Sequence, residues 1–111
     1  MTDCVFCKIA AKEVPTKLVY EDRDVVAFED LNPRAPLHVL VIPRRHVESL
    51  AKLDDAALAG KLTLVAAKIA KDAGHGDNFR VVVNNGAGAG QSVFHVHFHV
   101  LGGRAFSWPP G

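Results

Sequence analysis

The chain has 111 residues, a length that fits a single domain spanning residues 1–111. Hydrophobic residues make up 49% of it and charged residues 23%, which is typical of a folded globule. The net charge is +1 and the basic residues are scattered except at 43–46, so the sequence lacks the strongly basic face that bulk nucleic-acid binding needs. No stretch approaches the roughly 20 apolar residues of a membrane helix, and the N-terminus lacks a basic segment followed by an apolar run. We therefore expect a cytoplasmic protein that binds a small anion and neither nucleic acid nor a membrane.

The first third of the chain predicts three short elements. Residues 4–12 carry apolar side chains at near-helical spacing, which favours a short helix. Residues 17–20 and 25–28 are β-branched and aromatic runs separated by a polar turn, so two strands of a hairpin are predicted there. Residues 32–36 contain two prolines, which interrupt regular structure. A loop therefore follows the hairpin.

The middle of the chain predicts a strand and one long helix. Residues 38–42 alternate and place His38, Leu40 and Ile42 on one face of a strand. Residues 54–73 are rich in Ala, Leu and Lys and predict a helix whose apolar stripe is Leu58, Leu62, Val65 and Ile69. Four further positions widen this stripe, namely Ala59, Leu64, Ala66 and Ala67. The extra width indicates either a second buried surface against another subunit or a broad intramolecular face.

The last third adds two strands around a glycine-rich loop. The patterns at residues 79–83 and 94–101 predict strands. The proline-rich end of the chain carries Trp108, an apolar side chain that we expect to pack against another part of the protein. The total is five strands with few helices between them, which favours an antiparallel sheet. The predicted fold class is α+β, with a five-stranded antiparallel sheet, one long helix and a short N-terminal helix.

Three histidines occupy alternate positions in the last predicted strand. Side chains at every second position of a strand share a face, so His95, His97 and His99 would form a row with neighbours roughly 6–7 Å apart, while Val96 and Phe98 face the core. Because histidine titrates near neutrality, such a row can hold a phosphate, attack it and protonate the leaving group. The same pattern also fits a solvated face or a zinc hydrolase, although this strand contains no carboxylate for a general base.

The loop before this strand has glycines at positions 86, 88 and 90, followed by Gln91 and Ser92. Glycines let backbone amides approach a ligand closely, and the two polar side chains add hydrogen-bond donors. The spacing does not match a dinucleotide-binding fingerprint, which a helix should follow. A glycine-rich hairpin turn explains the loop equally well when it is considered alone.

The motif at residues 95–101, His-Val-His-Phe-His-Val-Leu, resembles that of the histidine triad (HIT) superfamily. The resemblance extends to residues 28–38, 41–43 and 90–93, and the ending Trp-Pro-Pro-Gly at 108–111 is similar to the histidine triad nucleotide-binding (HINT-like) branch. His99 separates the chain from the hexose-1-phosphate uridylyltransferase branch, which has glutamine at that position. The resemblance implies a purine nucleoside phosphoramidase that forms a covalent nucleotidyl-histidine.

The resemblance also implies catalytic roles. His97 would be the nucleophile, with a carbonyl of the Gly90 region accepting the hydrogen bond from its other ring nitrogen. Ser92 and His99 would stabilise charge on the phosphoryl oxygens and help to protonate the amine, and His38 would join the proton relay.

The nucleotide-binding residues follow from the same resemblance. Asp30 would bind the ribose hydroxyls and Asn84 would lie near the sugar, although an aspartate at a strand end is otherwise usually a turn residue. The base would occupy an apolar slot formed by Val5, Phe6, Ile9, Phe28 and Leu31, residues that would otherwise be assigned to the core. The remaining nucleotide contacts are assigned to Gly90, Gln91, Ser92 and Trp108.

Cys4 and Cys7 form the only cysteine pair, and in a reducing compartment this spacing indicates metal or redox chemistry. The pair resembles that of triad proteins that bind structural zinc, and the family pattern offers His46 and His95 to complete a Cys2His2 site. A metal-bound His95 could not act as a free proton relay. The alternatives are two buried reduced thiols or a thioredoxin-like pair, and the latter lacks a preceding strand.

Two other functions remain open. The chain could be a dinucleoside polyphosphate hydrolase, or a nucleotide-binding or protein-interaction module with weak turnover. The expected partners are a purine nucleoside monophosphate or its phosphoramidate, and a second copy of the chain in a homodimer with a continuous sheet. His75 receives no role.

Overall fold

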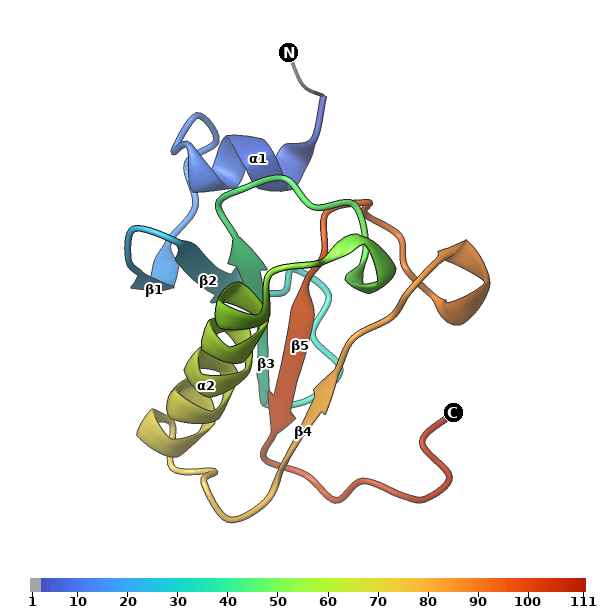
Figure 1. Ribbon diagram of the computed structural model, residues 1–111. Helices are drawn as coiled ribbons and strands as arrows, with labels where there is room; N and C mark the ends of the chain where they lie inside the picture. The colour runs from blue at the N-terminus through green and yellow to red at the C-terminus, as the bar shows by residue number, and fades with distance from the viewer. Residues whose placement is uncertain (1–2) are drawn as a thin grey trace.

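A computed structural model describes residues 3–111 and contains one five-stranded antiparallel sheet (Figure 1). The strands lie in the order β1-β2-β3-β5-β4. Their bounds are β1 Leu18–Glu21, β2 Val25–Glu29, β3 Leu37–Pro43, β4 Phe79–Val82 and β5 Phe98–Gly102. The helices are α1 Val5–Ala10 and α2 Ala56–Asp72, with short 3-10 turns η1 Leu50–Lys52 and η2 Ala87–Ala89. The predicted α+β fold class is therefore confirmed, and within the described residues no helix combines the length and apolar character that crossing a bilayer requires.

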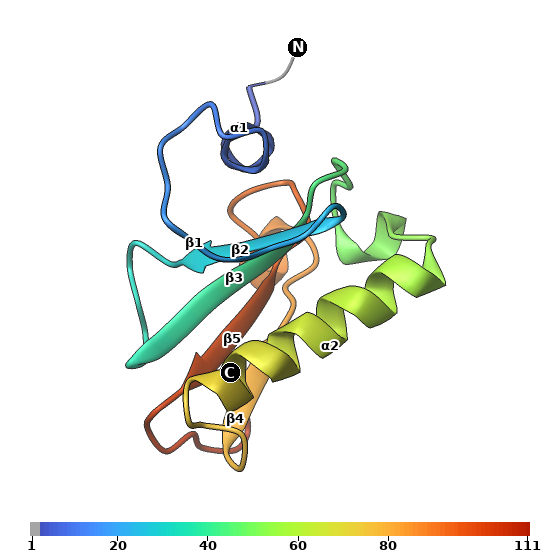
Figure 2. The same ribbon diagram turned by 90° about the vertical axis from the view of Figure 1, so that its left-hand side faces the viewer.

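The two helices cover opposite faces of the sheet (Figure 2). Alternate residues of the central strands, such as Val39 and Val41, point into one apolar cluster with α2. The intervening residues, such as Leu40 and Ile42, point into a second cluster with α1. Because side chains alternate along a strand, one sheet supports both clusters and its central strands are buried on both faces. The larger apolar cluster lies between the sheet and α2, and the smaller one lies between the sheet and the six-residue helix α1.

Helix α2 begins at a side-chain cap and presents most of the predicted stripe to the sheet. The Asp55 carboxylate accepts a hydrogen bond from the Leu58 amide at 3.0 Å, which satisfies one of the unpaired amides of the first turn. Ala66 is buried in the chain's own core, which agrees with the alternative of a broad intramolecular face at this position. Leu64, by contrast, is 72% exposed.

The strand that carries the triad is shorter than predicted. Pairing of β5 with β3 starts at Phe98, opposite Val41, and His95 and His97 precede it. The backbone diverges there because the Val96 amide donates to the Val47 carbonyl at 2.7 Å, which draws the chain toward the segment that follows β3. The expectation of three histidines in one continuous strand is therefore wrong, although Val96 and Phe98 do face the core as predicted.

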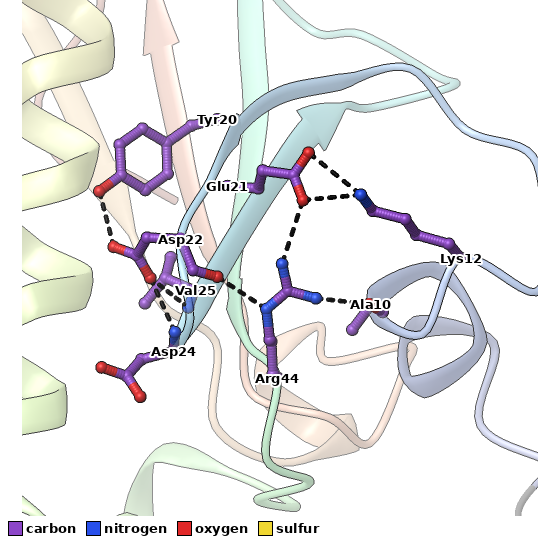
Figure 3. Close-up of polar contacts among 8 residues, drawn as sticks. All are labelled: Ala10, Lys12, Tyr20, Glu21, Asp22, Asp24, Val25 and Arg44. Atoms are coloured by element: carbon purple, nitrogen blue, oxygen red, sulfur yellow. Dashed lines mark hydrogen bonds and ion pairs between the residues drawn. The ribbon is translucent and has the colours of Figure 1, made fainter.

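The turn between β1 and β2 is organised by Asp22 (Figure 3). Its carboxylate accepts hydrogen bonds from the amides of Asp24 and Val25, both at 2.8 Å, and from the Tyr20 hydroxyl at 2.7 Å. Burial alone would raise the pKa of Asp22, but these hydrogen bonds and the one from Lys61 outweigh it and hold the pKa well below its usual value. The turn therefore keeps a fixed shape while the carboxylate stays ionised.

Arg44, just after β3, connects this turn to α1 (Figure 3). Its guanidinium donates from Nε to the Asp22 carbonyl and from Nη1 to the Ala10 carbonyl, both at 2.7 Å. Nη2 also lies 3.2 Å from a carboxylate oxygen of Glu21. The Ala10 carbonyl belongs to the last turn of α1, where the α-helical pattern leaves carbonyls without partners. Arg44 thus anchors the C-terminal end of α1 to the edge of the sheet.

Candidate active site and metal cluster

His97 is buried and held in one orientation by its own segment. Its Nδ1 lies 2.8 Å from the carbonyl oxygen of His95. A carbonyl can only accept, so Nδ1 carries the ring proton and Nε2 keeps a lone pair, the form that a nucleophile needs. The acceptor predicted in the Gly90 region is wrong, because the carbonyl two residues earlier in the chain already occupies Nδ1.

His38 and His99 form a hydrogen-bonded pair beside His97. The Arg34 amide donates to His38 Nδ1 at 2.9 Å, so His38 carries its proton on Nε2. His38 Nε2 lies 2.9 Å from His99 Nδ1 and donates to it, which leaves the proton of His99 on Nε2. The His97 and His99 rings lie 5.0 Å apart between centroids. One imidazole with a lone pair therefore lies next to one that donates a proton.

Burial keeps this pair of histidines neutral. Burial, the largest cause, and the neighbouring His97 and His38 together lower the pKa of His99 to about 4, against the opposing attraction of Asp30. Burial also lowers the pKa of His38, against the opposing attraction of Asp30, whose Oδ2 is 3.3 Å from His38 Nε2. Near pH 7 both rings are uncharged hydrogen-bonding groups.

We expect these shifts to make the protein less stable in acid. An unfolded histidine binds a proton near pH 6.5, whereas folded His99 resists protonation down to about pH 4, so stability falls as the pH drops across that interval. His99→Asn should flatten this part of the curve. Thermal unfolding of both proteins at several pH values between 4 and 7 measures the difference, and parallel curves would contradict it.

A cavity of about 610 Å³ opens between α1 and the sheet beside these rings. Four predicted polar or catalytic residues line it, namely Asp30, Ser92, His97 and His99. All five residues of the predicted apolar slot line it as well, namely Val5, Phe6, Ile9, Phe28 and Leu31. The lining also includes residues that the sequence did not single out, among them Val14, Pro15, Thr16, Lys17, Val19 and Val93. Most of these follow α1, where no motif marks them.

Four predicted nucleotide-binding residues do not line this cavity, namely Asn84, Gly90, Gln91 and Trp108. Gln91 is buried, and its side-chain oxygen accepts from the Gly86 amide at 2.8 Å. Its side-chain nitrogen donates to the carbonyls of Glu48 at 2.8 Å and Val93 at 3.1 Å. This amide therefore fixes the shape of the glycine loop. Trp108 is 82% exposed on the single chain.

The four predicted metal ligands converge on one point near α1. Cys7 Sγ lies 3.3 Å from His46 Nδ1, and the sulfurs of Cys4 and Cys7 lie 3.4 Å and 3.5 Å from His95 Nδ1. Two ligands of one tetrahedral zinc, a sulfur and a nitrogen, are separated by about 3.6 Å given their bond lengths to the metal. The side chains therefore have the chemistry and nearly the spacing of a Cys2His2 zinc site.

The orientation of the His95 ring is suited to metal binding. Its Nε2 lies 2.8 Å from the Pro43 carbonyl and donates to it, so the lone pair is on Nδ1, which faces the sulfurs. Hydrogen bonding of the distal nitrogen to a carbonyl is typical of histidine ligands. Burial, the largest cause, lowers the pKa of His95 to about 4, which keeps the ring neutral as ligation requires.

A second group of possible ligands, Asp30, His38 and His99, lies in the catalytic region. Here the two nitrogens are 2.9 Å apart, the distance of a hydrogen bond. Two nitrogens on one tetrahedral zinc would be about 3.3 Å apart. This second group therefore fits proton exchange better than metal binding.

With this geometry in place, comparison with known proteins identifies the family. The model of the HIT domain matches residues 11–106, and the chain belongs to the HIT family. It is 54% identical over 111 residues to an uncharacterized HIT-like protein, slr1234, of Synechocystis, covering 98% of this chain and 97% of that protein. It is also 47% identical over 111 residues to a 14 kDa zinc-binding protein of Zea mays, covering 96% and 87% of the two chains.

Solved structures show the same architecture. A HIT family hydrolase from Legionella pneumophila superimposes with a TM-score of 0.95 and 41% sequence identity, covering 98% of this chain and 100% of that one. The resemblance of the sequence to the histidine triad superfamily is thus confirmed at the level of the family.

Proposed function

We propose that the chain hydrolyses the P–N bond of purine nucleoside 5′-phosphoramidates through a covalent nucleotidyl-His97 intermediate. The observation that carries this proposal is the hydrogen bond from His97 Nδ1 to the His95 carbonyl, which directs a lone pair of Nε2 for attack. The attacking ring lines a cavity whose walls include the apolar side chains of Val5, Phe6, Ile9, Phe28 and Leu31, and such an apolar slot suits a purine. Similarity to a HIT family hydrolase supports the assignment to a nucleotide hydrolase in general.

The reaction would proceed in two displacements at phosphorus. In the first, the lone pair of His97 Nε2 forms a bond to phosphorus while the P–N electron pair leaves with the amine. In the second, water attacks phosphorus and His97 leaves. Over the cycle the amine takes up one proton and the attacking water releases one, so His99 and Ser92, which would transfer them, end unchanged. His38 would hold the His99 ring through the 2.9 Å contact.

The choice of substrate can be tested with two compounds. An adenosine 5′-phosphoramidate of an alkylamine should release AMP faster than a dinucleoside polyphosphate does at equal concentration. The reverse order would favour polyphosphate hydrolysis. No turnover of either compound, with nucleotide still bound, would favour a binding module.

Asp30 is proposed to bind the ribose. Its Oδ2 is 3.3 Å from His38, its Oδ1 accepts from the Asn32 amide at 2.8 Å, and the residue lines the cavity. Asp30→Asn should raise KM for a ribonucleotide substrate about 10-fold, the effect of losing a hydrogen bond to a charged group. KM for the 2′,3′-dideoxy compound should change little. Equal effects on both substrates would show that Asp30 acts through His38 alone.

One zinc ion is proposed at Cys4, Cys7, His46 and His95, where it would crosslink α1 to the sheet without entering the reaction. The similarity to a zinc-binding protein of Zea mays supports this site. A cytoplasmic location is part of the proposal, because the cysteines must stay reduced to bind metal.

A homodimer is proposed from one exposed side chain and one open sheet edge. Leu64 on α2 is 72% exposed, and β4 is an edge strand with Val81 37% exposed, so an edge-to-edge contact would continue the sheet. Sedimentation should give about twice the chain mass of 12.0 kDa. Leu64→Asp should shift the protein toward the monomer, whereas a monomer in the parent protein would exclude this dimer.

A further inference from the structure

The metal cluster and the nucleophile share one residue, His95. The ring of His95 contributes Nδ1 to the cluster, and its backbone carbonyl accepts the hydrogen bond from His97 Nδ1. The ring is also fixed from the other side by the Pro43 carbonyl, and the residue is completely buried. A displacement of the His95 backbone therefore moves the acceptor that orients His97.

Helix α1 connects the same two histidines through Phe6. The Phe6 ring packs edge-on against His95 at 6.0 Å and against His97 at 5.2 Å between centroids. Phe6 lies between Cys4 and Cys7, so ligation of these sulfurs fixes the turn that presents its ring. At the other end of the helix, Arg44 holds the Ala10 carbonyl independently of the cluster. The two attachments can therefore be removed separately.

We propose that Cys4 and Cys7, by binding a metal together with His46 and His95, are positioning residues that keep His97 in the tautomer and orientation required for attack. For its catalytic consequence this inference rests on the proposed function. Without the metal, Nδ1 of His95 loses its coordinate bond, and the turn from Cys4 to Cys7 that presents Phe6 is no longer crosslinked to the sheet. The His95 carbonyl then no longer holds Nδ1 of His97 in a single geometry, and His97 samples both tautomers.

The expected kinetic effect is a fall in kcat of about 10-fold to 100-fold when the metal is lost, as is typical when groups behind a reacting residue are removed. The direct test measures the tautomer of His97 in the absence of substrate. Protein with 15N-labelled histidine is compared in three states: loaded with zinc, stripped by a chelator and reloaded. The measurements are zinc per chain and the 15N shifts of the His97 ring, which report its tautomer.

Two variants distinguish positioning of His97 by the metal from a general loosening of helix α1. Cys7→Ser removes one ligand but keeps the Cys4 sulfur that caps α1 by accepting from the amide of residue 7. Arg44→Gln releases the far end of α1 and leaves all four ligands in place. We expect a single His97 tautomer in the zinc-loaded parent and in Arg44→Gln. We expect a mixture of tautomers in the stripped parent and in Cys7→Ser, with circular dichroism showing that both are folded. Reloading zinc should restore the parent but not Cys7→Ser.

Two results would overturn the proposal. One is an unchanged His97 tautomer after zinc has left a folded chain. The other is the same mixture in Arg44→Gln with zinc still bound, which would show that any loosening of α1 has this effect.

A second measurement needs no metal-free protein. In chain loaded with 113Cd, His97→Ala removes the donor to the His95 carbonyl and should shift the cadmium resonance, whereas His99→Ala, which is close but lacks this connection, should not. Equal shifts, or none, would overturn the proposal. Because neither spectrum involves turnover, absence of phosphoramidase activity would reject the proposed function while leaving this inference supported or rejected by its own data.

Discussion

His97→Ala should reduce AMP release from an adenosine phosphoramidate by roughly 10⁴-fold or more, to the level that binding and the remaining groups sustain. The expected loss is this large because the substitution removes the only group that we propose to bond to phosphorus. Mass spectrometry of parent protein quenched during turnover should find one added nucleotide on the peptide that contains His97. The variant should carry none.

His75→Gln is a suitable control for this experiment. His75 packs against Gly102 at the far end of β5 and does not line the 610 Å³ cavity, so the variant should keep parental turnover and the adduct. Parental rates in His97→Ala, or an adduct on a different peptide, would refute the covalent mechanism. A merely unfolded variant is recognised by its circular dichroism.

His99→Ala should slow hydrolysis by about 10²-fold to 10⁴-fold when the leaving group is an alkylamine, which is basic and must be protonated as it departs. The loss should be much smaller for an arylamine that leaves readily without a proton. The measurement is kcat for parent and variant on both substrates. This dependence on the leaving group separates proton transfer from a general defect.

His38→Asn provides the matched comparison, since it removes the donor to His99 Nδ1 but leaves the His99 ring in place. A smaller loss with the same leaving-group trend is expected. If His99→Ala lost the same factor on both amines, the ring would act by binding the phosphoryl oxygens and not by moving a proton.

The architecture was predictable where periodicity is strong. The long helix at residues 54–73 and the strand at 38–42 have apolar stripes that only one kind of element can bury, and both are present with ends shifted by one or two residues. The strand at 94–101 was predicted too long because alternation continues through His95 and His97 although the backbone there pairs with the loop at Val47. Side-chain pattern does not reveal the partner of a backbone amide.

The same limit explains what the sequence missed in the site. The acceptor for His97 is a backbone carbonyl, and the group that fixes the tautomer of His38 is the backbone amide of Arg34. Every residue supplies such groups, so no motif identifies them. The catalytic histidines and the four metal ligands were identifiable because their side chains carry the chemistry. In the structure the four metal ligands form one cluster, and His97 and His99 line one cavity. Gln91 shows the opposite case, a polar side chain in a suggestive loop that is used internally.

The unequal covering of the sheet has a consequence for how proteins of this architecture diversify. The thick apolar layer between α2 and the sheet contains none of the residues proposed to contact a nucleotide, whereas Val5, Phe6 and Ile9 project from one short helix into the cavity. Substitutions at Val5 could therefore reshape the compartment for a different base at little cost in folding free energy. Selectivity would evolve on one side of the molecule while its thermal resistance is maintained on the other.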